Sequence, residues 1–102
     1  MPQVVQTERF RDWLGGLKDR QAAARVIARV ERIGRGNLGD VKPVGRGVSE
    51  TRIDYGPGYR VYFASKGATL IVLLAGGDKS TQAKDIKAAK ALWEAWKEAS
   101  DE

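Results

Sequence analysis

The chain contains no cysteine and no histidine among its 102 residues. Without cysteine no disulfide bond can form, and without either residue the usual ligands of zinc and other transition metals are missing. We therefore expect neither a metal site nor a cofactor. A chain free of cysteine is also typical of the reducing cytoplasm, and we expect a cytoplasmic protein.

Long hydrophobic runs are missing as well. The longest apolar run, Leu70 to Ala75, has the length of a strand, whereas a membrane-spanning helix needs about 20 apolar residues. The N-terminus shows no basic stretch followed by an apolar one, so we expect no secretory signal and no membrane association. A hydrophobic fraction of 42% is enough for one core, and we expect a single domain over residues 1–102.

Positive charge is in excess, with a formal net charge of +5, and it is unevenly distributed. Residues 1–60 hold 12 Lys and Arg against 7 Asp and Glu, whereas residues 61–102 hold 6 of each kind. A positive field over the first two thirds of the chain favours a polyanionic or acidic partner.

Apolar spacing predicts a short edge strand at Gln3–Gln6 and then two helices joined by a tight turn. Thr7 and Asp19 are the expected N-caps of these helices. The expected buried stripes are Phe10, Trp13, Leu14 and Leu17 in the first helix, and Ala23, Val26, Ile27, Val30 and Ile33 in the second.

Three strand candidates follow a glycine-punctuated connection at residues 37–47; they are Val48–Tyr55, Tyr59–Ala64 and Thr69–Ala75. Alternation places Arg52 on one face of the first strand and Arg60 on one face of the second, and it allows one face of the sheet to stay polar. The third strand is apolar on both faces, so we expect it to be central or covered.

A last helix is expected to begin near Ser80 or Thr81, with Ile86, Ala89, Trp93 and Trp96 as its apolar stripe. The tryptophan pair is expected in the core, with the rim of a partner groove as the alternative. The order β-α-α-β-β-β-α indicates a compact α+β domain in which two N-terminal helices pack on a small antiparallel sheet and a C-terminal helix follows.

The segment Gly77–Thr81 is not a phosphate-binding P-loop, because Asp78 stands where that motif needs a glycine before its lysine. Two interpretations remain open for it. The glycines and the following helix could present backbone N–H groups to an anion, with Lys79 adding a charge. The alternative is an ordinary strand-to-helix turn capped by Asp78 or Ser80.

Arg52 and Arg60 also have two interpretations. They could form surface ion pairs with Glu50 or Asp54, which are worth about 0–1 kcal/mol each. Alternatively their planar guanidinium groups could bind a phosphate with two hydrogen bonds each, which lysine cannot do.

The chain resembles the RelE/ParE toxin superfamily, and within it the HigB-like group of addiction-module killer proteins. The resemblance runs through nearly the whole chain. It is most specific at residues 56–63, Gly-Pro-Gly-Tyr-Arg-Val-Tyr-Phe, and at residues 76–82, Gly-Gly-Asp-Lys-Ser-Thr-Gln. It also includes residues 10–14, 25–30, 36–45 and 47–53.

The resemblance implies the toxin of a type II toxin–antitoxin system, which cuts mRNA on the ribosome by attack of a ribose 2′-OH on the adjacent phosphate. By motif, Arg60 matches an arginine that binds the scissile phosphate and Lys79 matches a basic residue at the transition state. Arg52 lies on the strand where relatives carry lysines. The further residues expected to bind RNA are Lys42, Arg46, Tyr59, Ser80 and Arg29.

The implied partners are a cognate antitoxin, expected to be of the helix-turn-helix type, together with the ribosome and mRNA. Operator DNA would be bound only through the antitoxin. The histidines used by other HigB proteins are absent, and the late tyrosine that stacks on a nucleobase in some RelE relatives has no match in the final helix. The general base would therefore be Glu50, Asp54, Asp78, a tyrosine or a lysine. The alternatives are a ParE-like inhibitor of DNA gyrase and a non-catalytic domain that binds RNA or protein.

Overall fold

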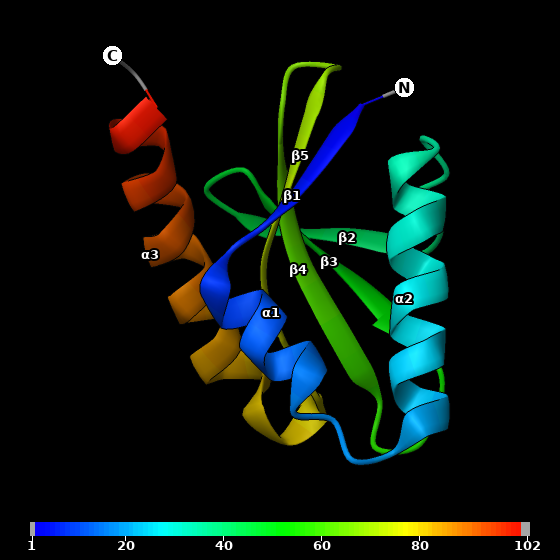
Figure 1. Ribbon diagram of the computed structural model, residues 1–102. Coiled ribbons are helices and arrows are strands. Elements are labelled where there is room, and N and C mark those ends of the chain that lie inside the picture. Colours follow the sequence, from blue (N-terminus) through cyan, green and yellow to red (C-terminus); the bar gives the residue numbers. More distant parts are fainter. Residues whose placement is uncertain (1, 101–102) are drawn as a thin grey trace.

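The computed structural model describes residues 2–100 and shows one mixed sheet between helices (Figure 1). The elements in chain order are β1 (Gln3–Gln6), α1 (Glu8–Gly15), α2 (Arg20–Gly34), β2 (Val41–Gly45), β3 (Val48–Ile53), β4 (Tyr59–Lys66), β5 (Leu70–Gly77), the 3₁₀ turn η1 (Lys79–Thr81) and α3 (Gln82–Ser100). The predicted α+β class is confirmed. No helix within residues 2–100 is long and apolar enough to cross a membrane.

The sheet has five strands in the order β1-β5-β4-β3-β2. The four strands β2 to β5 are antiparallel, as predicted, but β1 runs parallel to β5. The prediction missed β2, which lies in the segment assigned to a connection. Because β2 is an edge strand, it tolerates Pro43, which has no N–H to donate.

Both faces of the sheet are covered, so neither face stays polar in the way that the alternation would have allowed. Helices α1 and α2 cover one face, and Figure 1 shows α3 along the other side of the sheet. The first core contains Phe10, Val26, Ile33, Ile53, Val61, Phe63, Ile71 and Leu73. The second contains Val48, Tyr62, Ala64, Val72, Leu74, Ala75, Ala89 and Trp93. Strand β5 is buried on both faces, as expected.

The predicted starts of the first two helices are confirmed, whereas the last helix is preceded by a 3₁₀ turn capped by Asp78, not by Ser80 or Thr81, and begins at Gln82. Thr7 accepts a hydrogen bond from the Phe10 amide, and Asp19 accepts from the amides of Gln21 and Ala22. The buried stripe of α2 differs from the prediction, since Ala22 is buried in place of Ala23 and Ile27 is 46% exposed.

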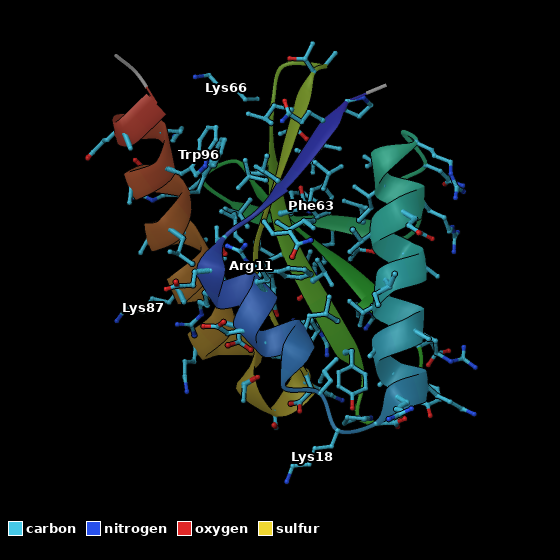
Figure 2. The ribbon with its side chains drawn as sticks, viewed as in Figure 1. Arg11, Lys18, Phe63, Lys66, Lys87 and Trp96 are labelled. Carbon is cyan, nitrogen blue, oxygen red and sulfur yellow. The ribbon has the colours of Figure 1, made fainter. Side chains whose placement is uncertain are left out.

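The tryptophans lie in or against the two cores, as predicted. Trp13 packs beside Phe10 at a ring-centroid distance of 5.7 Å, and Trp96 stacks on the buried Trp93, also at 5.7 Å. Figure 2 shows Phe63 inside the fold, whereas Lys18 and Lys87 project away from it. The apolar interior is thus separated from a charged surface, and the buried polar residues gather at one end of the sheet.

Candidate functional site

The three cations expected to act on a phosphate lie together. Arg52 on β3 pairs across the sheet with Arg60 on β4, and Arg60 pairs with Gly77, two residues before Lys79. They line one surface hollow of about 330 Å³, which we call the arginine hollow; its lining residues are Asp40, Arg52, Ile53, Asp54, Gly58, Arg60 and Lys79. The fold therefore brings the predicted catalytic residues to one place.

A second hollow of about 280 Å³ adjoins the first and shares Asp40, Arg52 and Arg60 with it. Lys42, on β2, lines this second hollow and lies opposite Glu50 of β3. Among the residues expected to bind RNA, Lys42 thus lines a hollow together with Arg52 and Arg60.

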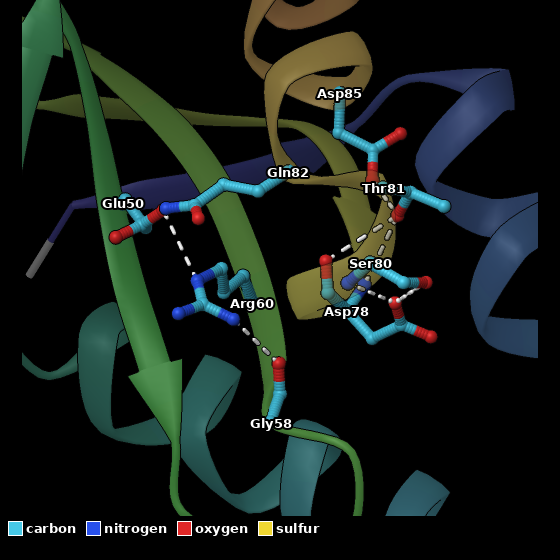
Figure 3. A network of polar contacts seen from close by, with 8 residues as sticks. All are labelled: Glu50, Gly58, Arg60, Asp78, Ser80, Thr81, Gln82 and Asp85. Atoms are coloured by element: carbon cyan, nitrogen blue, oxygen red, sulfur yellow. Dashed lines mark hydrogen bonds and ion pairs between the residues drawn. The ribbon is translucent and has the colours of Figure 1, made fainter.

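Arg60 is held rigidly, because its side chain is only 6% exposed and its guanidinium has fixed partners. Its Nε lies 3.3 Å from Oε1 of Glu50, and its Nη1 donates to the Gly58 carbonyl at 2.9 Å. The Nε2 of Gln82 donates to the same Glu50 oxygen at 2.8 Å. Figure 3 draws no contact at the third guanidinium nitrogen, Nη2. The arrangement fixes the direction of the guanidinium while leaving donors for a ligand.

Gly58 is required by the backbone of the turn between β3 and β4. Its φ is +81°, a conformation that favours glycine. A Cβ there would be in ordinary van der Waals contact with Arg60 Nη1 at 3.5 Å and with the Lys79 Cβ at 3.9 Å, so the turn lies beside both cations.

The segment after β5 is an ordinary strand-to-helix turn, which decides between the two interpretations of the glycine pair. Gly76 and Gly77 belong to β5, and the Asp78 carboxylate accepts hydrogen bonds from the Ser80 amide, at 2.8 Å, and from the Ser80 hydroxyl. The protein's own carboxylate thus occupies the amide that an anion would use. Lys79 remains exposed and faces the arginine hollow.

The other expected RNA-binding residues do not line the arginine hollow, although Ser80 directly follows Lys79 in η1. Arg46 is in the turn between β2 and β3, beyond the opposite end of β3 from Arg52, and its φ is +56°. Tyr59 packs against Trp13 at a centroid distance of 6.3 Å, on the face that α1 and α2 cover. Arg29, on α2, donates to the Thr51 hydroxyl and to the Arg52 carbonyl.

The carboxylates and phenols near the hollow differ in how well they could accept a proton. The hydrogen bond from the Ser80 hydroxyl lowers the pKa of Asp78, which weakens Asp78 as a base. Burial, together with the negative charges of Glu50 and Asp85, raises the pKa of Tyr62, so its phenol stays protonated. Asp54 is exposed, lines the arginine hollow and makes no hydrogen bond or ion pair with other residues in the range 2–100.

Sequence reasoning missed the buried acid Asp85 and its place beneath η1. Asp85 is 4% exposed, and the hydroxyl of Thr81 donates to its carboxylate. A signal for it exists in the sequence, because Asp85 precedes the buried Ala89 and Trp93 at intervals of four residues. An acid within the apolar stripe of a helix indicates a buried carboxylate.

The fold and the sequence can be compared with known proteins. Over 78% of this chain and the whole of the other, the fold is similar to a chain of the crystal structure of the toxin–antitoxin complex RelBE2 from Mycobacterium tuberculosis, with a TM-score of 0.61 and 25% sequence identity. The compact α+β fold therefore resembles that of a RelE toxin.

An uncharacterized protein of Haemophilus influenzae is 51% identical to the chain over 90 residues, which cover 88% of this chain and 91% of that protein. The model of the family described as "Phage derived protein Gp49-like (DUF891)" matches residues 12–94, which include every cation of the arginine hollow. The chain belongs to the phage-derived Gp49-like protein family.

Proposed function

We propose that the chain is the toxin of a type II toxin–antitoxin module, of the HigB-like group, and that it cuts mRNA on the ribosome. The observation that carries this proposal is the convergence of Arg52, Arg60 and Lys79 on one hollow. The similarity of the fold to a chain of the RelBE2 complex supports the same function.

The chemistry is an intramolecular transfer at phosphorus. The ribose 2′-oxygen forms a bond to the phosphorus and the bond to the 5′-oxygen breaks, which leaves a 2′,3′-cyclic phosphate and a 5′-OH. Arg60 and Arg52 hold the phosphate and neutralise the charge that develops on it, and Lys79 stabilises or protonates the departing oxygen.

Asp54 is the base that fits best among the three candidate carboxylates. Glu50 is buried and paired with Arg60, and Asp78 is tied to Ser80. Asp54 would take the proton of the 2′-OH from the rim of the arginine hollow.

The partners follow from the proposal. A helix-turn-helix antitoxin would neutralise the toxin and carry the binding to operator DNA, and the ribosome would present the mRNA in the cytoplasm. A further hollow lies between α2 and the end of β3, and its cations Arg25, Arg29 and Arg32 would supply positive charge for ribosomal RNA.

Primer extension on a translated reporter mRNA, after induction of the chain in cells, tests the proposal. The test variant is Arg52→Ala/Lys79→Ala, since both side chains are exposed and their loss leaves the core intact. The control variant, Arg35→Ala/Lys87→Ala, also removes two exposed cations, and neither lines the hollow.

Cuts that need translation, persist in the control and vanish in the test variant support the proposal. Growth arrest with intact mRNA and relaxed plasmid DNA would instead show gyrase inhibition, the function that the same fold supports in ParE-like proteins. Absence of both effects would refute toxicity and leave a binding domain.

A further inference from the structure

Lys79 reaches the arginine hollow from a very short segment of regular secondary structure. The 3₁₀ turn η1 contains only three residues, Lys79–Thr81, between the end of β5 and the start of α3. Because so short a turn has few backbone hydrogen bonds, its conformation depends on side-chain contacts. The contacts that fix the conformation of η1 therefore also fix the position from which the Lys79 side chain projects.

Two side chains fix the turn from opposite ends. Asp78 caps it through the Ser80 amide, and Thr81 closes a capping box through the Asp78 amide, whose nitrogen lies 3.3 Å from the Thr81 hydroxyl oxygen. The Thr81 hydroxyl also donates to the carboxylate of Asp85, one turn into α3 (Figure 3). The turn is therefore tied to the long helix by the backbone hydrogen bond from Gln82 to the Lys79 carbonyl and, among the side-chain contacts, by the Thr81 hydroxyl.

The Asp85 carboxylate is buried by the fold at a cost in free energy. It is 4% exposed, and a Cβ on Gly77 would overlap its Oδ2, so the carboxylate fits only because β5 ends in glycine. Its nearest cation is Arg9, 3.8 Å away and 45% exposed. A buried carboxylate with so little compensation adds little to stability, and a residue that breaks the apolar pattern in this way points to function.

We propose that Asp85 and Thr81 are positioning residues for Lys79. The Asp85 carboxylate holds the Thr81 hydroxyl, the hydroxyl holds η1, and η1 aims the Lys79 ammonium at the phosphate held by Arg60. The inference rests on the proposed function for its substrate, an RNA phosphate, but the anchoring itself belongs to the free protein.

A double-mutant cycle on the full chain separates positioning from a merely structural role. Thr81→Val keeps the shape of the side chain and removes the hydroxyl, and Thr81→Ser restores the hydroxyl. We expect Thr81→Val to lower the rate of ribosome-dependent mRNA cleavage by about 2- to 10-fold, the factor of one net hydrogen bond. Thr81→Ser should recover the rate, and Thr69→Val, the same kind of change at an exposed site at the far end of β5, should leave it unchanged.

The decisive comparison is made in the Lys79→Ala background. If Thr81 acts through Lys79, Thr81→Val causes no further loss there. An equal loss in both backgrounds, or no loss in either, would overturn the inference while leaving the proposed nuclease intact.

If the wild type proves not to cut mRNA, a second experiment decides the inference. The same variants are titrated with inorganic phosphate, and binding is monitored by the amide chemical shifts. We expect Thr81→Val to weaken phosphate binding only when Lys79 is present. That pattern without cleavage would refute the proposed function and keep the positioning role. Phosphate binding that is absent, or insensitive to Thr81→Val, together with absent cleavage, would refute both.

Discussion

The ion pair between Glu50 and Arg60 gives a sharp test of the site, because both side chains are almost fully buried, at 3% and 6% exposure. Glu50→Gln keeps the size of the side chain and a hydrogen-bond partner for Gln82 but removes the charge. The guanidinium of Arg60 is then buried without its counter-ion. Breaking a buried pair from one side costs about 3–5 kcal/mol, and we expect the lower end because the amide still fits.

This cost is large against the stability of a small domain, about 5–15 kcal/mol. With a urea dependence of about 1–3 kcal/mol per molar, the unfolding midpoint should fall by at least about 1 M. The assay is urea unfolding followed by tryptophan fluorescence, since Trp93 is buried in the second core.

Glu94→Gln is the matched control for this variant. Glu94 pairs with Lys97 at 3.1 Å on the surface, with side chains 48% and 40% exposed. Such a pair is worth about 0–1 kcal/mol, so the midpoint should hardly move. Adding Arg60→Met to Glu50→Gln should recover much of the loss, because both buried charges are then gone. Equal midpoints for Glu50→Gln and Glu94→Gln would refute the reasoning.

Three further variants test the fold and its pH dependence. Gly76→Ala should lower the free energy of unfolding by about 1–3 kcal/mol in urea melts, because its Cβ would overlap the Trp13 ring. Tyr62→Phe should leave stability at neutral pH unchanged or raised, because this buried hydroxyl has no hydrogen-bond partner within residues 2–100. Burial raises the Tyr62 pKa, so the wild type should lose stability above about pH 10 and the variant less, as urea midpoints at both pH values would show. The hydroxyl of Ser80 lowers the Asp78 pKa, so the stability that this carboxylate contributes is present above about pH 4 and lost below; in melts at about pH 5 and pH 3, Asp78→Asn should flatten that fall.

The elements that the sequence predicted well are those with local signals. Thr7 and Asp19 satisfy the first amides of their helices with their own side chains, so the helix starts needed no knowledge of the tertiary fold. Period-two alternation likewise assigned Arg52 and Arg60 each to one face of its own strand, and the short connection predicted that the two strands are neighbours; the structure pairs the two residues directly.

The parts that sequence reasoning missed depend on contacts between distant segments. Strand β2 carries Pro43 and Gly45 and forms because β3 offers it a partner. The exposure of Ile27 reflects which side of α2 faces the sheet, and spacing alone does not determine this. The ion pair of Arg60 with Glu50 was one of those that the sequence allowed, but it was expected on the surface and the structure buries it. The hydrogen bond from Gln82 of α3 to Glu50 was not expected, because it joins segments that are distant in the sequence.

The charges of the residues that line the two hollows determine how strongly the site attracts a ligand from solution. The two adjoining hollows contain four cations and three acids; these are Arg52, Arg60, Lys79 and Lys42, with Asp40, Asp54 and Glu50. Charges that nearly cancel produce a weak local field, so the site itself would attract a polyanion such as the proposed RNA only weakly from solution. The net positive charge resides largely on other surfaces, including α2 with Arg25, Arg29 and Arg32. A protein so arranged would bind a large polyanion with its outer surface and accept a phosphate at the arginine hollow only when the RNA is already held beside it, which is the situation of mRNA on a ribosome.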